Sequence, residues 1–182
     1  MDLLRNGRAR TEFERFAAVH ADALLRSAYL MAGDRGEAED LVQECLLRLA
    51  RKWPRVHSME HPGAYAHRVL FNLILDGGRR RARGRTELLS AQATDGDGRV
   101  EETTAALEAR VELVQALGAL PARQRAVLVL RYFADLPASE VARILDCSPG
   151  TIKSSTSRGL QRLREALDPA ASLSTADDTS PN

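Results

Sequence analysis

Side chains that suit contact with DNA are concentrated in residues 136–165, near the C-terminal end of the chain. Two short amphipathic patterns, ASEVARIL and PGTIKSSTSRGLQRL, are separated there by Asp146, Cys147 and Ser148. Ser148 is a preferred helix N-cap and Pro149 a preferred first helical residue, so the second helix is predicted to begin at this point. Two short helices joined by such a tight turn form a helix-turn-helix, a motif that binds DNA in the major groove.

The second helix of this motif presents a polar and basic face. Hydroxyl groups near its N-terminus can contact base edges or phosphates, and its basic residues supply the charge that dominates affinity for DNA. The candidate DNA contacts here are Ser148, Thr151, Lys153, Ser154, Ser155, Arg158 and Arg162. The predicted inward stripe is Ile152, Thr156, Gly159 or Leu160, Leu163 and Leu167, in which the glycine allows another helix to approach closely. An ordinary helical hairpin with a solvated polar face is the alternative, but the cap, the turn length and the small residue together favour the DNA-binding motif.

A second group of basic residues ends an earlier helical pattern. Five arginines stand between positions 79 and 85, where they suit contact with phosphates or a favourable position at a helix C-terminus. The candidate DNA contacts within this run of arginines are Arg79, Arg80 and Arg81. Gly77 and Gly78 precede the arginines, and each costs about 1 kcal/mol in a helix relative to alanine. The helix is therefore predicted to end or fray near Asp76.

Three helices are predicted to position the N-terminal candidates. The second begins at Asp34, with Glu37 in a capping-box position, and ends before Pro54. Residues 54–62 are predicted to form a loop, and Pro62 to begin the third helix. The apolar stripes are Phe13, Phe16, Ala17, His20, Leu24 and Ala28 in the first helix, Ala38, Leu41, Val42, Cys45, Leu46, Leu49 and Trp53 in the second, and Tyr65 or Ala66, Val69, Leu70, Leu73 and Ile74 in the third.

The predicted architecture is all-α, with two small helical domains at residues 10–85 and 106–167. Residues 86–105 carry Gly, Thr, Asp and Glu without a sustained period, which predicts a flexible acidic linker. Residues 168–182 are predicted to form a disordered tail. The expected apolar face of the second domain is Leu107, Val111, Val114 and Leu117, followed after Pro121 by Val127, Leu130 and Phe133.

Composition and charge agree with a helical protein that contacts nucleic acid. Aromatic residues make up only 4% of the chain, so a core of Leu, Val, Ile and Ala is expected, which favours helices over strands. Residues 1–85 hold 16 Lys and Arg against 11 Asp and Glu, and residues 107–167 hold 9 against 6. Acidic segments follow both blocks, which is typical of a chain with two modules that face nucleic acid.

Other functional classes find little support in the residues. There is no glycine-rich phosphate loop, catalytic triad pattern or metal-ligand cluster, so an enzyme, a cofactor and a metal are not expected. Cys45 and Cys147 stand far apart and are expected to be small buried side chains rather than a disulfide. No apolar run is long enough to cross a bilayer and no signal peptide is evident, so a cytoplasmic location is expected.

Two separate blocks of the chain resemble one known family. Residues 120–133, LPARQRAVLVLRYF, followed by the helix-turn-helix, resemble region four of the extracytoplasmic-function sigma factors of RNA polymerase. The segments DLVQE at 40–44 and YAHRVLFN at 65–72 resemble region two of the same family. The order of region two, linker and region four also matches that of the family, over about residues 10–167. The amino-acid sequence of both blocks is most similar to that of an actinobacterial branch of the family.

The resemblance implies a sigma factor, which binds core RNA polymerase and directs promoter recognition, DNA opening and transcription initiation. It implies that Asp40, Gln43 and Glu44 dock on the clamp helices of the polymerase β′ subunit. It also implies a further contact between this protein and the β flap of the polymerase. The family also admits an anti-sigma factor as a partner, which the sequence does not identify.

The resemblance also implies roles for the DNA-facing candidates. The loop at 54–62, with Tyr65, Arg68 and Asn72, would capture an unstacked base of the minus-ten element, and the arginine run would lie along promoter DNA. The second helix of the helix-turn-helix would read the minus-thirty-five element. Its implied base contacts are Thr151, Ser154, Ser155 and Arg158, and its implied phosphate contacts are Lys153 and Arg162.

Simpler interpretations remain open for single residues and for the function of the whole chain. The acidic face of the second helix is also compatible with simple solvation, Tyr65 with a core position and Arg68 with a surface charge, although the resemblance favours the docking role for the acidic face. A stand-alone helix-turn-helix regulator would account for residues 107–167 but would leave the N-terminal block without a purpose. Family members often carry tryptophan where this chain has Gly77 and Gly78, so an aromatic wedge is missing there.

Overall fold

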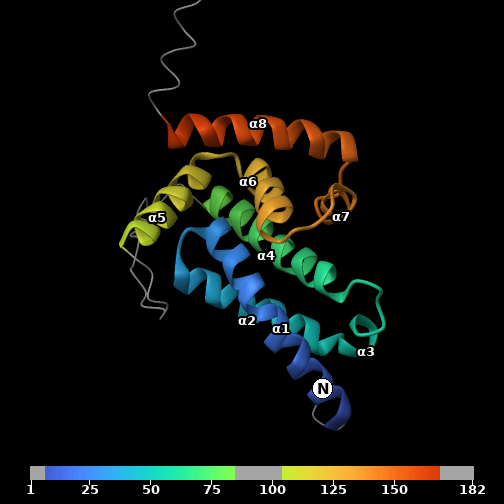
Figure 1. Cartoon of the computed structure of the whole chain (residues 1–182). Helices are drawn as coiled ribbons and strands as arrows, with labels where there is room; N and C mark the ends of the chain where they lie inside the picture. Colours follow the sequence, from blue (N-terminus) through green and yellow to red (C-terminus); the bar gives the residue numbers. More distant parts are fainter. Residues whose placement is uncertain (1–6, 85–103, 169–182) are drawn as a thin grey trace, which may run out of the picture.

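A computed structural model describes residues 7–84 and 104–168, with side chains from 7 to 78 and from 107 to 168. These ranges consist of helices joined by short turns and loops and contain no strand, which confirms the all-α prediction (Figure 1). The elements are α1 (Gly7–Ala32), α2 (Arg35–Arg51), α3 (Trp53–Val56), α4 (Pro62–Gly84), α5 (Thr104–Ala119), α6 (Ala122–Leu128), the π-helical turn η1 (Val129–Phe133), α7 (Ala138–Ile144) and α8 (Pro149–Leu167).

Helices α1, α2 and α4 pack against one another as an N-terminal unit. Gly33 ends α1 with φ +77°, a left-handed conformation that glycine adopts without strain, and its N–H donates to the carbonyl of Tyr29 at 2.8 Å. Asp34 then caps α2, because its Oδ1 accepts from the backbone N–H of Glu37 at 2.7 Å. The core of this unit is built largely from the predicted stripes, and Leu30, Met31, Val56 and Phe71 are buried in addition.

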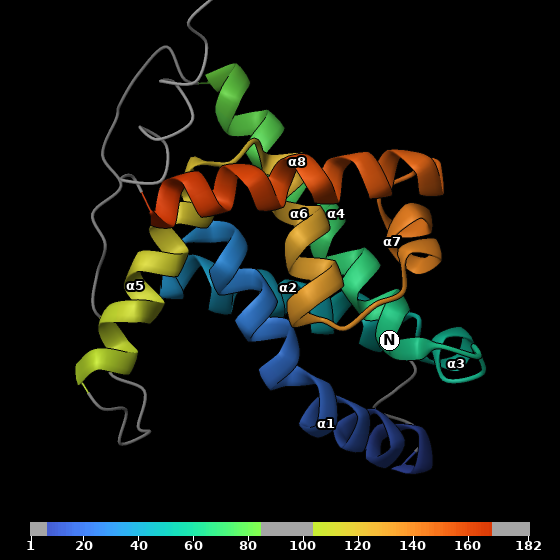
Figure 2. The ribbon, with the colours of Figure 1, turned by 45° about the horizontal axis from the view of Figure 1, so that its top comes forward.

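Helices α5 to α8 form a C-terminal unit in which α8 lies across α6, with α5 near one end and α7 near the other (Figure 2). Helices α6 and α8 approach closely at Gly159 of α8, where an added Cβ would lie 3.2 Å from Cγ of Leu128 in α6. The sequence-based expectation for this glycine is confirmed. The first and second helices of the helix-turn-helix, α7 and α8, also pack directly against each other.

The two units share a continuous apolar core, because α1 packs against η1, α5 and α6, and α7 packs against α4. Arg125 ties them together: its Nη1 donates to the carbonyl of Met31 at 2.6 Å, and its Nη2 donates to that of Gly118 at 2.7 Å. The guanidinium of Arg110 lies over the ring of Tyr29, 5.1 Å from its centre. Burial lowers the pKa of Arg125, and the carbonyl acceptors at two helix ends compensate for part of its lost hydration.

The third predicted helix does not end near Asp76, so that prediction is wrong. Helix α4 continues through Gly77 and Gly78 to Gly84. The first half of α4 is anchored by buried residues such as Leu70, and the arginines that follow the glycines are good helix formers. The summed propensity of the helix therefore outweighs the cost of two glycines.

Other boundaries also differ from the predictions. The predicted loop at 54–62 begins inside the short helix α3, because Pro54 occupies a first-turn position where its missing N–H is not needed. Helix α5 begins at Thr104, one residue before the predicted end of the linker. Residues 86–103 and 169–182, where a linker and a disordered tail are predicted, lie outside the described residues.

Four predicted core side chains are exposed instead. Leu107 and Val111 lie on the first turns of α5, before it meets the other helices, and Leu167 is the last residue of α8. Phe133 is the last residue of the π-helical turn η1, whose wider spacing rotates it away from the face that an α-helix would give it. The exposed fractions are 50% for Leu107, 40% for Val111, 41% for Phe133 and 37% for Leu167.

The two cysteines differ in environment. Cys45 is buried, its thiol donates to the carbonyl of Ala66 at 3.5 Å, and burial raises its pKa to about 12. Cys147 is partly exposed in the turn before α8, and both thiols are free. Among the described helices, none is both long and apolar enough to cross a membrane.

Replacing Gly159 with alanine tests the close contact between α8 and α6. We expect Gly159→Ala to lower the free energy of unfolding, because overpacking against buried Leu128 costs about 1–3 kcal/mol and outweighs a helix-propensity gain of about 1 kcal/mol. Gly118→Ala is the matched control, since an added Cβ there meets no atom within 4 Å, and it should raise stability. Urea denaturation measures both, and equal stabilisation by the two variants would contradict the packing.

Thiol labelling tests the burial of Cys45. Because the thiolate is the reactive form, a maleimide or disulfide reagent at neutral pH should modify Cys147 in the native protein and leave Cys45 unmodified. Both should react in denaturant. Mass spectrometry of the labelled peptides reads out the result, and native labelling of Cys45 at a rate similar to that of Cys147 would contradict the structure.

Candidate nucleic-acid interfaces

The turn between α7 and α8 is fixed by hydrogen bonds. Asp146 adopts a left-handed conformation with φ +49°, and the N–H of Cys147 donates to the carbonyl of Ala142 at 3.0 Å. Ser148 caps α8, because its Oγ accepts from the backbone N–H of Thr151 at 3.1 Å. Arg123 donates to the carbonyl of Leu145 at 3.0 Å and so satisfies the end of α7. The predicted helix-turn-helix and its N-cap are confirmed.

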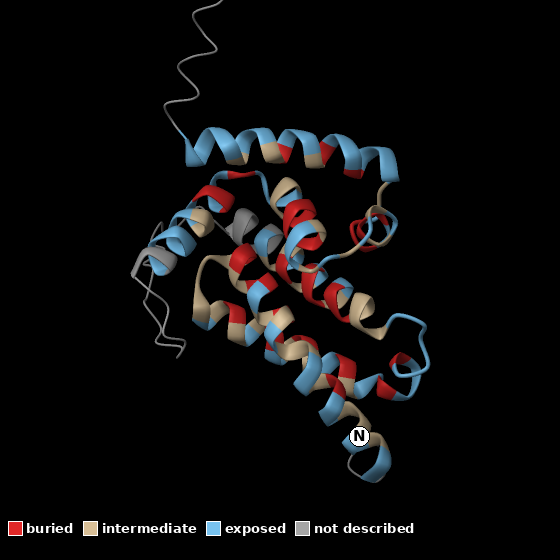
Figure 3. Cartoon of the chain, in the orientation of Figure 1, coloured by how far each residue is buried: buried red, intermediate tan, exposed pale blue. Residues whose placement is uncertain are grey.

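The outer side of α8 is exposed along its length (Figure 3). The exposed candidates are Thr151, Lys153, Ser154, Arg158 and Arg162. Nη2 of Arg158 donates to Oγ of Ser154 at 3.3 Å, which lays the guanidinium along the helix surface. Arg162 donates to Oε1 of Gln124 at 3.3 Å and is thus held near α6. The helix therefore offers a polar face with at least two cations that a DNA groove can approach.

Ser155 does not belong to this exposed face, and its predicted outward position is wrong. It is 7% exposed and lies between Ile152 and Gly159 on the side that packs on the other helices. A helix with 3.6 residues per turn brings positions 152, 155 and 159 to one side, so the inward stripe is wider than the sequence pattern suggested. The hydroxyl of Ser148 accepts from the N–H of Thr151 in the N-cap and also lies 2.9 Å from Oγ1 of Thr151, which leaves one hydrogen-bonding position for an outside partner.

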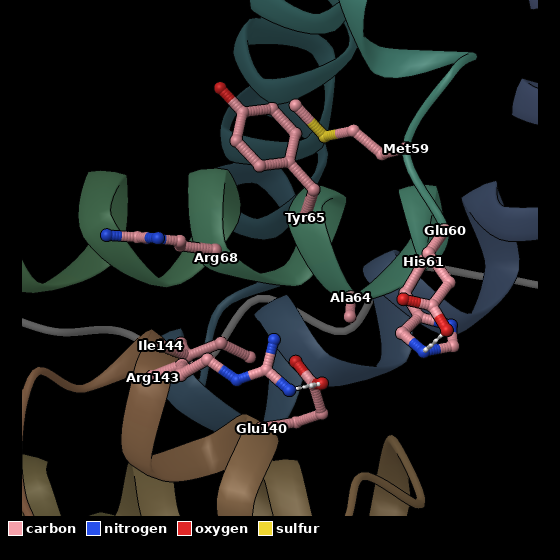
Figure 4. Close-up of a pocket in the computed structure, with 9 residues that line it drawn as sticks. All are labelled: Met59, Glu60, His61, Ala64, Tyr65, Arg68, Glu140, Arg143 and Ile144. Carbon is pink, nitrogen blue, oxygen red and sulfur yellow. Dashed lines mark hydrogen bonds and ion pairs between the residues drawn. The ribbon is translucent and has the colours of Figure 1, made fainter.

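A second group of candidates lies on the first turns of α4. Arg68 and Asn72 are exposed, and Tyr65 is half-buried. Tyr65 and Arg68 line a hollow of about 210 Å³ together with Met59 of the preceding loop (Figure 4). The opposite wall of this hollow comes from α7, where Glu140 and Arg143 form an ion pair; Ile144 of the same helix completes it.

The arginine run has its backbone in the last turns of α4, which extends to Gly84. The side chains of Arg79, Arg80 and Arg81 lie outside the part of the chain whose side chains the structure describes. Their helical backbone places them beyond Asn72 on the same helix that carries Tyr65 and Arg68. The candidate DNA contacts of the N-terminal unit thus come from a single element.

The acidic candidates occupy the outer side of α2. Asp40 and Gln43 are exposed, and Glu44 accepts a hydrogen bond from Nε of Arg48 at 2.7 Å. Sequence reasoning missed Leu47, which is 54% exposed one turn further along this face. The spacing 40, 43, 44, 47 is itself the helical i, i+3, i+4, i+7 pattern, so the signal was present. In the described ranges no three His, Cys, Asp or Glu side chains gather as metal ligands would.

Comparison with known proteins identifies two family regions in this chain. The family models for sigma-70 region 2 and for sigma-70, region 4 match residues 16–84 and 110–163. The chain is 36% identical to an RNA polymerase sigma-E factor of Streptomyces avermitilis, over 86% of each chain. It is 35% identical to the ECF RNA polymerase sigma factor SigL of Mycobacterium tuberculosis, over 81% of this chain and 84% of the other. Both relatives come from actinobacteria, in agreement with the predicted branch.

A solved structure shares the fold as well. The sigma factor RpoE from Bartonella quintana, in complex with the anti-sigma factor NepR, superposes with a TM-score of 0.70 at 25% identity, over 86% of this chain and 97% of that one. The matched regions therefore follow the predicted order in sequence and the same packing in space. The chain belongs to the extracytoplasmic-function sigma factors of the sigma-70 family, and its function is that of a sigma factor in transcription initiation.

Proposed function

We propose that this sigma factor binds core RNA polymerase in the cytoplasm and directs it to promoters by reading two DNA elements. Helix α8 reads the minus-thirty-five element, and the first turns of α4 with the loop before them capture a base of the minus-ten element. The observation that carries the proposal is the presence, in one chain, of two separate features: a capped helix-turn-helix with an exposed basic face, and the half-buried ring of Tyr65 beside the exposed Arg68. The chain supplies recognition, and the polymerase supplies the chemistry.

Helix α8 suits insertion in the major groove, which is wide enough to admit one α-helix. Thr151, Ser154 and Arg158 follow one another along a single exposed side. Hydroxyls and a guanidinium can both pair with base edges, and arginine pairs with guanine through two hydrogen bonds. Lys153 and Arg162 flank this side and suit phosphates, which position the helix without reading sequence.

The first turns of α4 suit an unstacked base. The ring of Tyr65 offers a flat surface for stacking, and Arg68 offers hydrogen-bond donors at the edge of the same hollow. Asn72 and the arginines of the last turns of α4 continue along the helix toward the phosphate backbone. Stacking on one aromatic side chain is worth about 1–3 kcal/mol per base, enough to help hold a melted strand.

The polymerase is proposed to bind both units. Asp40, Gln43 and Glu44 present carboxylate and amide oxygens to the basic clamp helices of the β′ subunit, with the exposed Leu47 as an apolar centre. The C-terminal unit is proposed to contact the β flap. We also propose an anti-sigma factor as a partner, supported by the solved relative that is bound to one.

Reading both elements requires the two units to separate. The centres of the two elements are about 25 base pairs apart, which at 3.4 Å per pair is roughly 85 Å. A compact chain of this length has a radius of gyration of about 16 Å and cannot span that distance. Energy transfer between dyes on α2 and α8 should therefore fall when the polymerase complex binds a promoter, and an unchanged signal would contradict the separation.

Run-off transcription tests the proposed function. Purified core polymerase and this protein, mixed with promoter fragments, should start transcription at defined sites, whereas either component alone should not. Absence of initiation and of core binding, combined with tight binding to duplex DNA by the protein alone, would instead indicate a stand-alone regulator.

Arg158→Ala tests base reading by α8. If Arg158 contacts a base, its loss should weaken binding to the preferred promoter by about 1–3 kcal/mol and relax the preference at one position of the minus-thirty-five element. Arg164→Ala is the matched control, because Arg164 is exposed on the same helix but faces a different direction. Competition binding with single-base promoter variants measures both. An equal loss on every promoter would assign Arg158 to a phosphate.

A further inference from the structure

The loop before α4 has no buried side chain of its own. Residues 57–61 are all exposed, although their neighbours Val56 and Ala66 are fully buried. The position of this loop, and of the first turn of α4 that follows it, must therefore be fixed at its two ends. Both ends are held by rings from α1 and from the helices that border the loop.

Trp53 holds the beginning of the loop. Its ring centre lies 5.3 Å from that of Phe13 in an edge-to-face arrangement and 5.0 Å from that of Phe16, and it is 4% exposed. Nδ1 of His57 lies 3.0 Å from the carbonyl of Trp53, so the first loop residue is tied to the same group of rings.

Gly63 holds the end of the loop, because it fits between two histidines. A Cβ at this position would lie 2.8 Å from Cε1 of His20, closer than side chains tolerate. The His20 ring in turn lies on Phe16, with ring centres 4.4 Å apart, so it has little freedom to move aside. Nδ1 of His67 lies 3.1 Å from the Gly63 carbonyl. Helices α1 and α4 thus meet at the second residue of α4.

Packing alone does not explain why a histidine occupies position 67. It is 5% exposed, and its Nε2 has no hydrogen-bond partner in the described structure. Burial lowers its pKa, and a carbonyl can only accept, so the neutral ring carries its proton on Nδ1 and donates it to Gly63. A leucine would fill similar space without leaving a buried nitrogen unpaired, so the donated hydrogen bond is the property that distinguishes histidine here.

We propose that His20, Gly63 and His67 form a positioning unit, the glycine clamp, that fixes the first turn of α4 and so sets where Tyr65 and Arg68 meet the minus-ten base. Tyr65 stands two residues after Gly63 and Arg68 one helical turn further on, so a shift at the clamp moves both. The inference rests on the proposed function of this turn and adds residues that do not themselves touch DNA.

The first test compares two glycine-to-alanine changes in α4. Both Gly63→Ala and Gly78→Ala favour the helix, but only the first meets an obstacle, since an added Cβ at Gly78 has no atom within 4 Å. Promoter opening by the polymerase complex is followed through permanganate reactivity of thymines in the minus-ten element. We expect Gly63→Ala to open the promoter at least tenfold more slowly, with unchanged binding to core polymerase and to the minus-thirty-five element. Gly78→Ala should behave as the wild type.

The second test compares two replacements of His67. Asparagine can donate to the Gly63 carbonyl from nearly the same position as Nδ1, whereas leucine fills the space without a donor. We expect His67→Asn to open promoters within threefold of the wild-type rate and His67→Leu to be at least tenfold slower at similar thermal stability. If Gly63→Ala fails to fold, the comparison of His67→Asn with His67→Leu still tests the positioning role of the glycine clamp.

Opposite results would overturn the clamp. Opening at the wild-type rate by Gly63→Ala, or equal rates for His67→Asn and His67→Leu, would show that the first turn of α4 is positioned without it. If the wild-type protein and core polymerase open no promoter at all, the proposed function fails first, and the clamp falls with it.

Discussion

One half-buried guanidinium, that of Arg125, links backbone carbonyls of the two halves of the molecule across their shared apolar core. Arg125 reaches the carbonyl of Met31 at the end of α1 and the carbonyls of Gly118 and Leu120 where α5 turns into α6. Carbonyl groups at helix ends lack partners within the helix, so one cation there satisfies several acceptors at once. The contact thus joins the end of α1 to the corner between α5 and α6, from which η1 and the helix-turn-helix continue.

Local chemistry made the helix starts predictable. Helices α2 and α8 begin directly after their N-caps Asp34 and Ser148, and α4 begins at Pro62, all as expected. These starts were predictable because capping involves only a few neighbouring residues. The π-turn η1 and the contact between Arg125 and Met31 were not predictable in this way. The first arises from a local widening that period counting does not detect, and the second joins residues 94 positions apart.

The same distinction applies to the functional sites. The face of α8 followed from helical periodicity, except at Ser155, where the tight approach of α6 at Gly159 widens the buried side. The family pattern identified Tyr65, Arg68 and Asn72, but it did not identify the side chains that hold the loop before them in place. These side chains are His20 of α1 and Trp53 of α3, and contacts between such distant segments produce no periodic pattern in a sequence.

The exposed side of α8 has a consequence for how this protein can change over generations. Thr151, Lys153, Ser154 and Arg158 are exposed and take no part in the core that holds the two units together. Surface substitutions away from caps and buried groups usually alter stability by less than about 0.5 kcal/mol. A duplicated copy of the gene could therefore acquire a new set of promoters through a few changes on this side, while its cap, its glycine contact and its attachment to polymerase stay as they are.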